Sequence, residues 1–136
     1  MFYTETMILP ELDVVDALPL DVEALALRAI AAVNATLSPI LFNGKDVMFG
    51  LRIDTDDAVQ TLNRDFRQKD KSTNVLSFPA DIETLEPNEC YLGDIILATG
   101  VLQHEAKDLN IPLEHHFIHL VIHGALHLME YDHILD

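Results

Sequence analysis

The spacing of apolar positions changes along the chain between a period of two and a period near 3.6, which predicts strands and helices in turn. Residues 47–53 carry Val, Phe, Leu and Ile at every second position, a pattern typical of a strand. Proline suits the first turn of a helix, so a last helix, rich in histidine, is expected to begin near Pro112. The remaining elements are predicted as strands at residues 1–10, 73–78 and 91–97 and as helices at residues 21–37, 55–67 and 99–109.

Capping and breaking residues set the expected ends of these elements. Asp54 or Thr55 can cap the second helix, because either side chain accepts hydrogen bonds from the first backbone N–H groups. The first strand is expected to end at Pro10, and residues 11–20 to form a loop. Residues 80–90 are acidic and contain a proline, so we expect a surface loop there.

The last helix is apolar on nearly every side, which predicts a central, buried element. Its apolar positions are Leu113, Phe117, Leu120, Val121, Ile122 and Leu126. The element order β-α-β-α-β-β-α-α predicts an α+β fold in which helices pack on a mixed sheet of about four strands. We see no linker or repeat and expect residues 1–136 to form a single domain.

Composition excludes a disordered or membrane-spanning chain. The 136 residues are 49% hydrophobic, and no apolar run has the length needed to cross a bilayer. The segment from Met1 to Glu5 has no basic residues, so no signal peptide is predicted. Cys90 is the only cysteine and cannot form an intrachain disulfide. We therefore expect a cytoplasmic protein without a membrane partner.

The formal net charge of −15 argues by itself against a nucleic-acid partner. Four of the eight cationic residues nevertheless lie in one window, at Arg64, Arg67, Lys69 and Lys71. Exposed charges beyond about 8 Å are largely screened at physiological salt. A local basic patch can therefore bind phosphate on an acidic protein.

Three histidines form the strongest candidate site. His123 and His127 are four residues apart and share one face of a helix. No helix brings position i+10 to the same point, so we expect the chain to reverse after His127 and return His133 to the other two. Three neutral imidazoles would leave a tetrahedral zinc ion one open position, as in catalytic zinc sites. A polar seam of histidines satisfied by carbonyls and water is the alternative.

The other histidines are expected to have lesser roles. His119 lies one turn before His123 and is expected to line the cleft or hold a hydrogen bond behind the ligands. His104, His115 and His116 are expected on the surface or in packing positions. Asp132 can accept a hydrogen bond from a ligand imidazole or remain a solvated turn residue.

The histidine spacing is similar to that of metzincin proteases, with one residue changed. Those enzymes carry a glutamate after the first histidine as general base, and Gly124 stands at this position here. Zinc alone can lower the pKa of bound water to about 7. Peptide hydrolysis is therefore less favoured than phosphoester chemistry.

Two motifs together resemble the YbeY family of endoribonucleases, which act in ribosomal RNA maturation. One runs from Leu62 to Pro79 (LNRDFRQKDKSTNVLSFP), and the other is the histidine segment preceded by Leu92-Gly93-Asp94-Ile95. The resemblance implies one zinc ion on His123, His127 and His133 and a functional arginine at Arg67. It also implies cleavage of single-stranded RNA, with roles at the 3′ end of the small-subunit RNA and in ribosome quality control.

The chain departs from the family pattern at three points. Glu130 stands where the family usually has Gly, Ser72 stands where it usually has Pro, and the family normally continues past the last histidine. The expected roles are phosphate neutralisation by Arg67 and contacts of Lys69 and Lys71 with the flanking backbone. For both lysines, a solvated helix end is an equally good interpretation.

Two other functions remain open. One is a different zinc hydrolase, such as a peptidase. The other is a non-enzymatic ribosome-assembly factor with a mainly structural metal, which the acidic charge and Glu130 favour. Nickel or copper can also bind three imidazoles.

Overall fold

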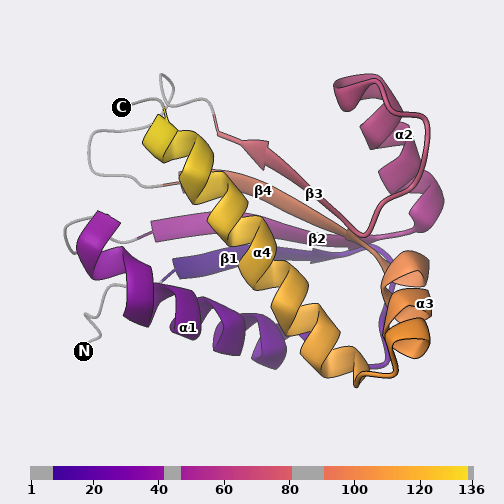
Figure 1. The fold of residues 1–136 in the computed structure, drawn as a ribbon, viewed down its shortest axis with the longest axis horizontal. Coiled ribbons are helices and arrows are strands. Elements are labelled where there is room, and N and C mark those ends of the chain that lie inside the picture. Colours follow the sequence, from indigo (N-terminus) through magenta and orange to yellow (C-terminus); the bar gives the residue numbers. More distant parts are fainter. Residues whose placement is uncertain (1–7, 42–46, 81–90, 135–136) are drawn as a thin grey trace.

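Four strands form one mixed sheet in the order β1-β2-β4-β3 (Figure 1). The computed structural model describes residues 8–41, 47–80 and 91–134. Within these ranges, β1 (Ile8–Val14), β2 (Val47–Asp54) and β4 (Tyr91–Ala98) run parallel, and β3 (Val75–Pro79) pairs antiparallel with β4. The helices are α1 (Val22–Leu41), α2 (Asp56–Arg67), α3 (Thr99–Leu109) and α4 (Leu113–Ile134). The predicted α+β class, mixed sheet and element order are confirmed.

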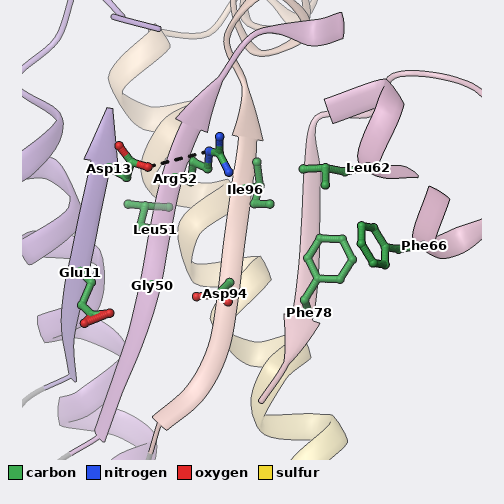
Figure 2. Close-up of a pocket in the computed structure, with 10 residues that line it drawn as sticks. All are labelled: Glu11, Asp13, Gly50, Leu51, Arg52, Leu62, Phe66, Phe78, Asp94 and Ile96. Carbon is green, nitrogen blue, oxygen red and sulfur yellow. Dashed lines mark ion pairs between the residues drawn. The ribbon is translucent and has the colours of Figure 1, made fainter. Parts of the chain in front are cut away.

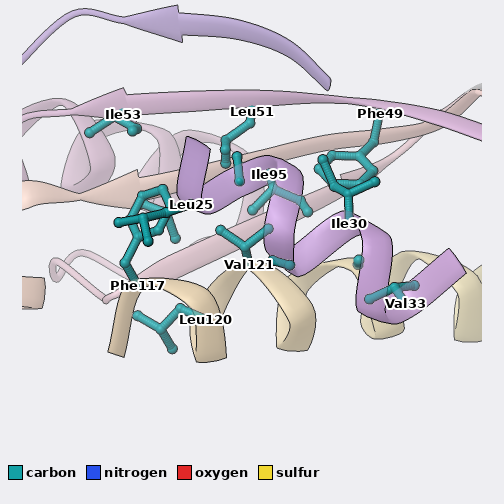
Figure 3. Close-up of a cluster of buried hydrophobic side chains, with 14 of the residues drawn as sticks. Leu25, Ile30, Val33, Phe49, Leu51, Ile53, Ile95, Phe117, Leu120 and Val121 are labelled. Atoms are coloured by element: carbon teal, nitrogen blue, oxygen red, sulfur yellow. The ribbon is translucent and has the colours of Figure 1, made fainter. Parts of the chain in front are cut away.

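Helices α1 and α4 lie against one face of the sheet and bury the main core between them and the strands (Figures 1 and 3). Alternate strand residues point into this core, as the period of two requires. The fully buried strand residues there are Phe49, Leu51, Ile53, Ile95 and Leu97, and the helices contribute Leu25, Ile30, Val33, Phe117, Leu120, Val121 and Leu128. The last helix, α4, is therefore buried along its sheet side as expected. Its other side is exposed, with Leu126 at 41%, so the predicted burial on nearly every side is wrong.

Helix α2 packs on the opposite face, over β3 and β4. Val59 of α2 forms a second apolar cluster with Leu76, Ile96 and Ala98. Ile96 lies between Ile95 and Leu97 in sequence, so its side chain points away from the main core. Thr55 caps α2 as predicted, because its hydroxyl accepts a hydrogen bond from the Ala58 backbone N–H at 3.1 Å.

The expected ends of two elements are wrong. Strand β1 continues past Pro10 to Val14, so residues 11–14 belong to a strand and not to the predicted loop. Proline is tolerated there because β1 is an edge strand. Helix α1 continues past Pro39 to Leu41, although a break was expected there. The predicted loop at residues 81–90 lies outside the described residues, as does Cys90.

The start of α3 is capped from another helix. Ala98 precedes α3 and supplies no side-chain cap. The Asp56 carboxylate accepts hydrogen bonds from the backbone N–H groups of Gly100 and Val101 at 2.8 and 3.0 Å. A Cβ on Gly100 would lie 2.3 Å from a carboxylate oxygen of Asp56, so glycine permits the close approach. This contact joins the first turns of α2 and α3.

Gly93 lies in β4 opposite Pro79 of β3, in a backbone conformation that favours glycine. Its φ of +137° is rarely adopted by residues with a side chain. A Cβ there would lie 2.1 Å from the carbonyl oxygen of Phe78. The backbone conformation therefore explains why glycine occupies the second position of the motif Leu92-Gly93-Asp94-Ile95.

None of the described helices is both long enough and apolar enough to cross a bilayer.

Candidate functional site

Arg67 is the last residue of α2 and is tied to the edge strand of the sheet. Its guanidinium Nη1 donates to the backbone carbonyl of Ser77 in β3 at 3.4 Å. The next residue, Gln68, has a left-handed φ of 61° and ends the helix with backbone N–H bonds to its last turn. The chain therefore turns sharply just after Arg67 and begins the loop with the two lysines.

Buried Asn63 anchors this basic loop to α2. Its side-chain amide donates to the Lys71 carbonyl at 2.8 Å, and its backbone carbonyl accepts from the Lys69 N–H at 3.2 Å. Ser72 donates from its hydroxyl to the Asp56 carbonyl at 3.1 Å, which fixes the position where the family usually has proline. Lys69 and Lys71 are thus exposed on a loop whose backbone is held in place.

Helix α4 presents His119, His123 and His127 along its solvent side. The ring centroids of His119 and His123 lie 6.3 Å apart and are stacked, and those of His123 and His127 lie 5.5 Å apart. All three side chains are exposed, while their neighbours Leu120, Val121 and Leu128 are buried. The helical period places the imidazoles together, as predicted for His123 and His127.

Gly124 lets α4 lie close to the sheet behind these histidines. A Cβ at Gly124 would lie 3.0 Å from a methyl carbon of Ile95 in β4. A glutamate at this position would point toward the core and away from the histidines. The side chain that metzincins use as a base therefore has no place at this site.

The predicted reversal after His127 is not observed. Helix α4 continues to Ile134. Ten helical residues rise about 15 Å, so on this backbone His123 and His133 do not meet at one point. The side chains of residues 129–134, His133, Glu130 and Asp132 included, lie outside the described part. Ligation by His133 therefore stays a prediction.

Arg67, the basic loop and the two histidines line one pocket, which we call the basic pocket. It encloses about 330 Å³. Ser77 joins its two walls, because its carbonyl accepts from Arg67 while its hydroxyl donates to the Gly124 carbonyl at 3.3 Å. The lining residues are Asn63, Arg67, Lys69, Lys71, Thr73, Asn74, Val75, Leu76, Ser77, His123 and His127. Five of the six predicted site residues therefore lie together.

Two described side chains in this pocket are suitable metal ligands. Neighbouring imidazoles one helical turn apart are a common pair of zinc donors. Over the described ranges, no three His, Cys, Asp or Glu side chains are grouped closely enough to hold a metal ion. His123 and His127 fit two positions of the expected ligand set, and the third depends on His133.

The remaining histidines lie at other positions. His116 is buried and its Nε2 lies 2.9 Å from the Glu105 carboxylate. His104 is exposed and its Nε2 lies 3.1 Å from Asp108. Both agree with the packing or surface positions expected for them, and exposed His115 does so as well.

The polar residues that shape the site were missed from the sequence. Asn63 and Ser77 lie inside the Leu62–Pro79 motif, but no role was assigned to either. Asn63 occurs four residues after buried Val59, so it occupies a core-facing helical position with a polar side chain. A buried amide needs hydrogen-bond partners. A polar residue at a core-facing position was therefore the signal by which the sequence could have indicated a structural role for Asn63.

A larger pocket of about 540 Å³ lies on the sheet face covered in part by α2 (Figure 2). Exposed Phe66 and partly buried Phe78 meet edge to face there, with ring centroids 5.8 Å apart. The polar lining residues are Glu11, Asp13, Arg52 and Asp94. Asp94 also accepts a hydrogen bond from the Tyr91 hydroxyl. The pKa of Tyr91 is raised, chiefly by burial and next by this hydrogen bond. None of the predicted site residues with a described side chain lines this pocket.

Comparison with known proteins gives one consistent family. A family model described as Endoribonuclease YbeY matches residues 18–136. An Endoribonuclease YbeY of Rhizorhabdus wittichii is 42% identical over 125 residues, with 85% of this chain and 74% of the relative covered. That of Zymomonas mobilis is 44% identical over 142 aligned positions, with 96% and 80% covered.

A solution structure from Thermotoga maritima supports the fold alone. It matches with a TM-score of 0.50 and 24% identity, and the match covers 87% of this chain and 71% of that chain. The basic pocket, the sequence relatives and the family match agree with the resemblance carried by the two motifs. The chain belongs to the endoribonuclease YbeY family.

Proposed function

We propose that this protein is a zinc-dependent endoribonuclease that cleaves single-stranded RNA in the cytoplasm. Its substrate is ribosomal RNA, at the 3′ end of the small-subunit RNA and in ribosome quality control. The observation that carries the proposal is the basic pocket, where a guanidinium, two ammonium groups and two imidazoles line about 330 Å³. A phosphodiester is a substrate with the charge that this lining favours.

Arg67 binds and neutralises the phosphate. A guanidinium binds two phosphate oxygens at once and stabilises charge that develops on them. Its bond to the Ser77 carbonyl orients the side chain toward β3, in the pocket that His123 also lines. Lys69 and Lys71 hold the flanking RNA backbone, since the loop that carries them is anchored by Asn63.

His123, His127 and His133 would hold the zinc ion. When bound, zinc supplies a Lewis acid and a water molecule of lowered pKa. Because α4 is helical to Ile134 in the described backbone, binding of His133 to the same ion requires the last turns to leave the helix. Zinc binding is therefore expected to lower the helical content of the protein, and His133→Ala is expected to abolish this change.

The first experiment compares Arg67→Ala with Arg64→Ala. Arg64 is exposed on the same helix and is paired with Asp65 at 3.2 Å, and it does not line the basic pocket. Loss of a group that stabilises developing charge lowers the rate by about 100-fold or more. We expect this loss in kcat/KM on a single-stranded RNA for Arg67→Ala, with little change for Arg64→Ala.

Zinc content measured by mass spectrometry controls for damage to the metal site. We expect both variants to keep the zinc content of the wild type. Equal activity of Arg67→Ala and Arg64→Ala would contradict the role of Arg67. Cleavage that persists after chelation would contradict the role of zinc.

An assembly factor without catalysis is the second candidate. One observation favours it: on the continuous helix α4, the described backbone brings His123 and His127 together but not His133. This alternative predicts small-subunit binding that survives His127→Ala, together with no metal-dependent cleavage of RNA.

A further inference from the structure

A second hollow continues from the basic pocket past His123. It encloses about 500 Å³ and lies between the start of β3, α3 and α4. Asn74, Val75 and His123 line both spaces. We call it the adjoining hollow, and its other lining residues are Glu105, Asp108, Leu109, His116, His119 and Leu120. A ligand in the basic pocket therefore has an open neighbouring space to enter.

The two spaces differ in charge. The basic pocket is lined by Arg67, Lys69 and Lys71. The described lining of the adjoining hollow includes two carboxylates, Glu105 and Asp108, and no Lys or Arg. A second phosphate would be repelled there, because like charges close together are unfavourable. The hollow is suited to a neutral group with hydrogen-bond donors.

The walls of the adjoining hollow offer flat and apolar surface. The exposed His119 ring is stacked with His123, with an angle of 20° between the ring planes. Leu109 is 62% exposed at the end of α3, and Leu120 and Val75 complete the apolar lining. Single-stranded RNA is recognised largely by stacking its bases on aromatic side chains, and histidine is one of these.

Both carboxylate oxygens of Glu105 already form hydrogen bonds with other side chains of the protein. One of its oxygens lies 2.9 Å from His116 Nε2, and both oxygens accept from the Asn74 amide, at 3.0 and 3.3 Å. Asp108 makes one ion pair, from Oδ2 to His104, and is 63% exposed. A carboxylate has about four acceptor positions. Asp108 therefore has remaining capacity to accept bonds from a ligand.

We propose that the adjoining hollow binds the base of the nucleotide next to the scissile phosphate. The base stacks on His119 and directs an amino group toward Asp108. Guanine, cytosine and adenine carry exocyclic amino groups, whereas uracil has only a ring N–H between two carbonyls. The site therefore prefers amino-bearing bases over uracil. This inference rests on the proposed function, because it takes the basic pocket as the phosphate site.

Mononucleotides test the hollow without any cleavage, since they contain no phosphodiester linkage. Dissociation constants of cytidine 5′-monophosphate, uridine 5′-monophosphate and ribose 5-phosphate are measured by NMR titration of the zinc-loaded protein. We expect the cytidine nucleotide to bind about tenfold tighter than the uridine nucleotide, the usual value of one matched base contact. Ribose 5-phosphate is expected to bind most weakly.

Three variants separate stacking from hydrogen bonding. His119→Ala is expected to weaken cytidine nucleotide binding about tenfold, while His119→Phe keeps a stacking ring and binds as the wild type does. Asp108→Asn is expected to remove most of the preference for cytidine over uridine. His115→Ala is the matched control, because His115 is exposed on the same helix and does not line the hollow.

Two results would overturn the inference: equal binding of ribose 5-phosphate and the nucleotides, or equal loss of binding in His119→Ala and His119→Phe. Failure of the proposed function is distinguishable from both. Base-dependent binding without RNA cleavage by the zinc-loaded wild type would overturn the nuclease role and leave the base site standing. Cleavage of RNA with no base dependence would overturn the base site alone.

Discussion

The carboxylate of Asp56 should stabilise two helices at once, and its removal is the most direct test of the fold. The Gly100 and Val101 N–H groups at the start of α3 donate to this carboxylate at 2.8 and 3.0 Å. Loss of a side-chain cap costs about 0.5–2 kcal/mol, and loss of the charge at a helix N-terminus about 0.3–1 kcal/mol more. Asp56→Ala should therefore lower the free energy of unfolding by about 1–3 kcal/mol.

Urea unfolding followed by circular dichroism measures this loss. With a slope of about 2 kcal/mol per molar urea, the midpoint should fall by about 0.5–1.5 M. Asp57→Ala is the control, because Asp57 is an exposed carboxylate in the same first turn of α2 and its loss changes the net charge equally. Asp56→Asn keeps one acceptor oxygen and should lose about half as much. Equal midpoints for Asp56→Ala and Asp57→Ala would refute the reasoning.

Three further substitutions test other parts of the structure by the same measurement. Gln68→Gly should stabilise the protein by about 0.5–1 kcal/mol, because glycine adopts the left-handed φ without a steric cost, and an unchanged midpoint would contradict this. Gly93→Ala should destabilise the protein by more than about 3 kcal/mol, because the new Cβ would clash with the Phe78 carbonyl oxygen. Stability equal to that of the wild type would contradict the close approach of the two backbones at Gly93. Gly124→Glu should also destabilise it by about 3 kcal/mol or more, by placing a carboxylate against Ile95, and it should not create peptidase activity in a peptide-library assay.

Regular patterns made most of the fold predictable from the sequence. The alternation in residues 47–53 and the cap at Thr55 match β2 and the start of α2. The errors occur where tertiary context overrides a local signal. Pro10 was expected to end a strand, but an edge strand can tolerate a residue without an N–H donor. The strand order and the position of β3 at the edge depend on pairing between distant segments, which local periodicity does not specify.

The shared helix face of His123 and His127 was predictable from the sequence, but the groups that position the charged side chains of the basic pocket were not. The i, i+4 spacing of His123 and His127 gives their shared face directly. The contact of Arg67 with β3 joins residues ten positions apart through a sheet edge, and no helical or strand period predicts such a contact. The reversal expected after His127 followed from the assumption that three ligands must meet, whereas the described backbone continues as a helix.

The position of Ser77 makes the shape of the basic pocket depend on the edge of the sheet. Ser77 contacts Arg67 through its carbonyl and α4 through its hydroxyl, and it lies on β3, which pairs with β4 at the edge of the described sheet. In the described sheet β3 has a neighbouring strand on one side, so opening of this edge would separate Arg67 from α4. Detachment of one short strand would thus dismantle the basic pocket, while the core residues on β2 and β4 stay packed.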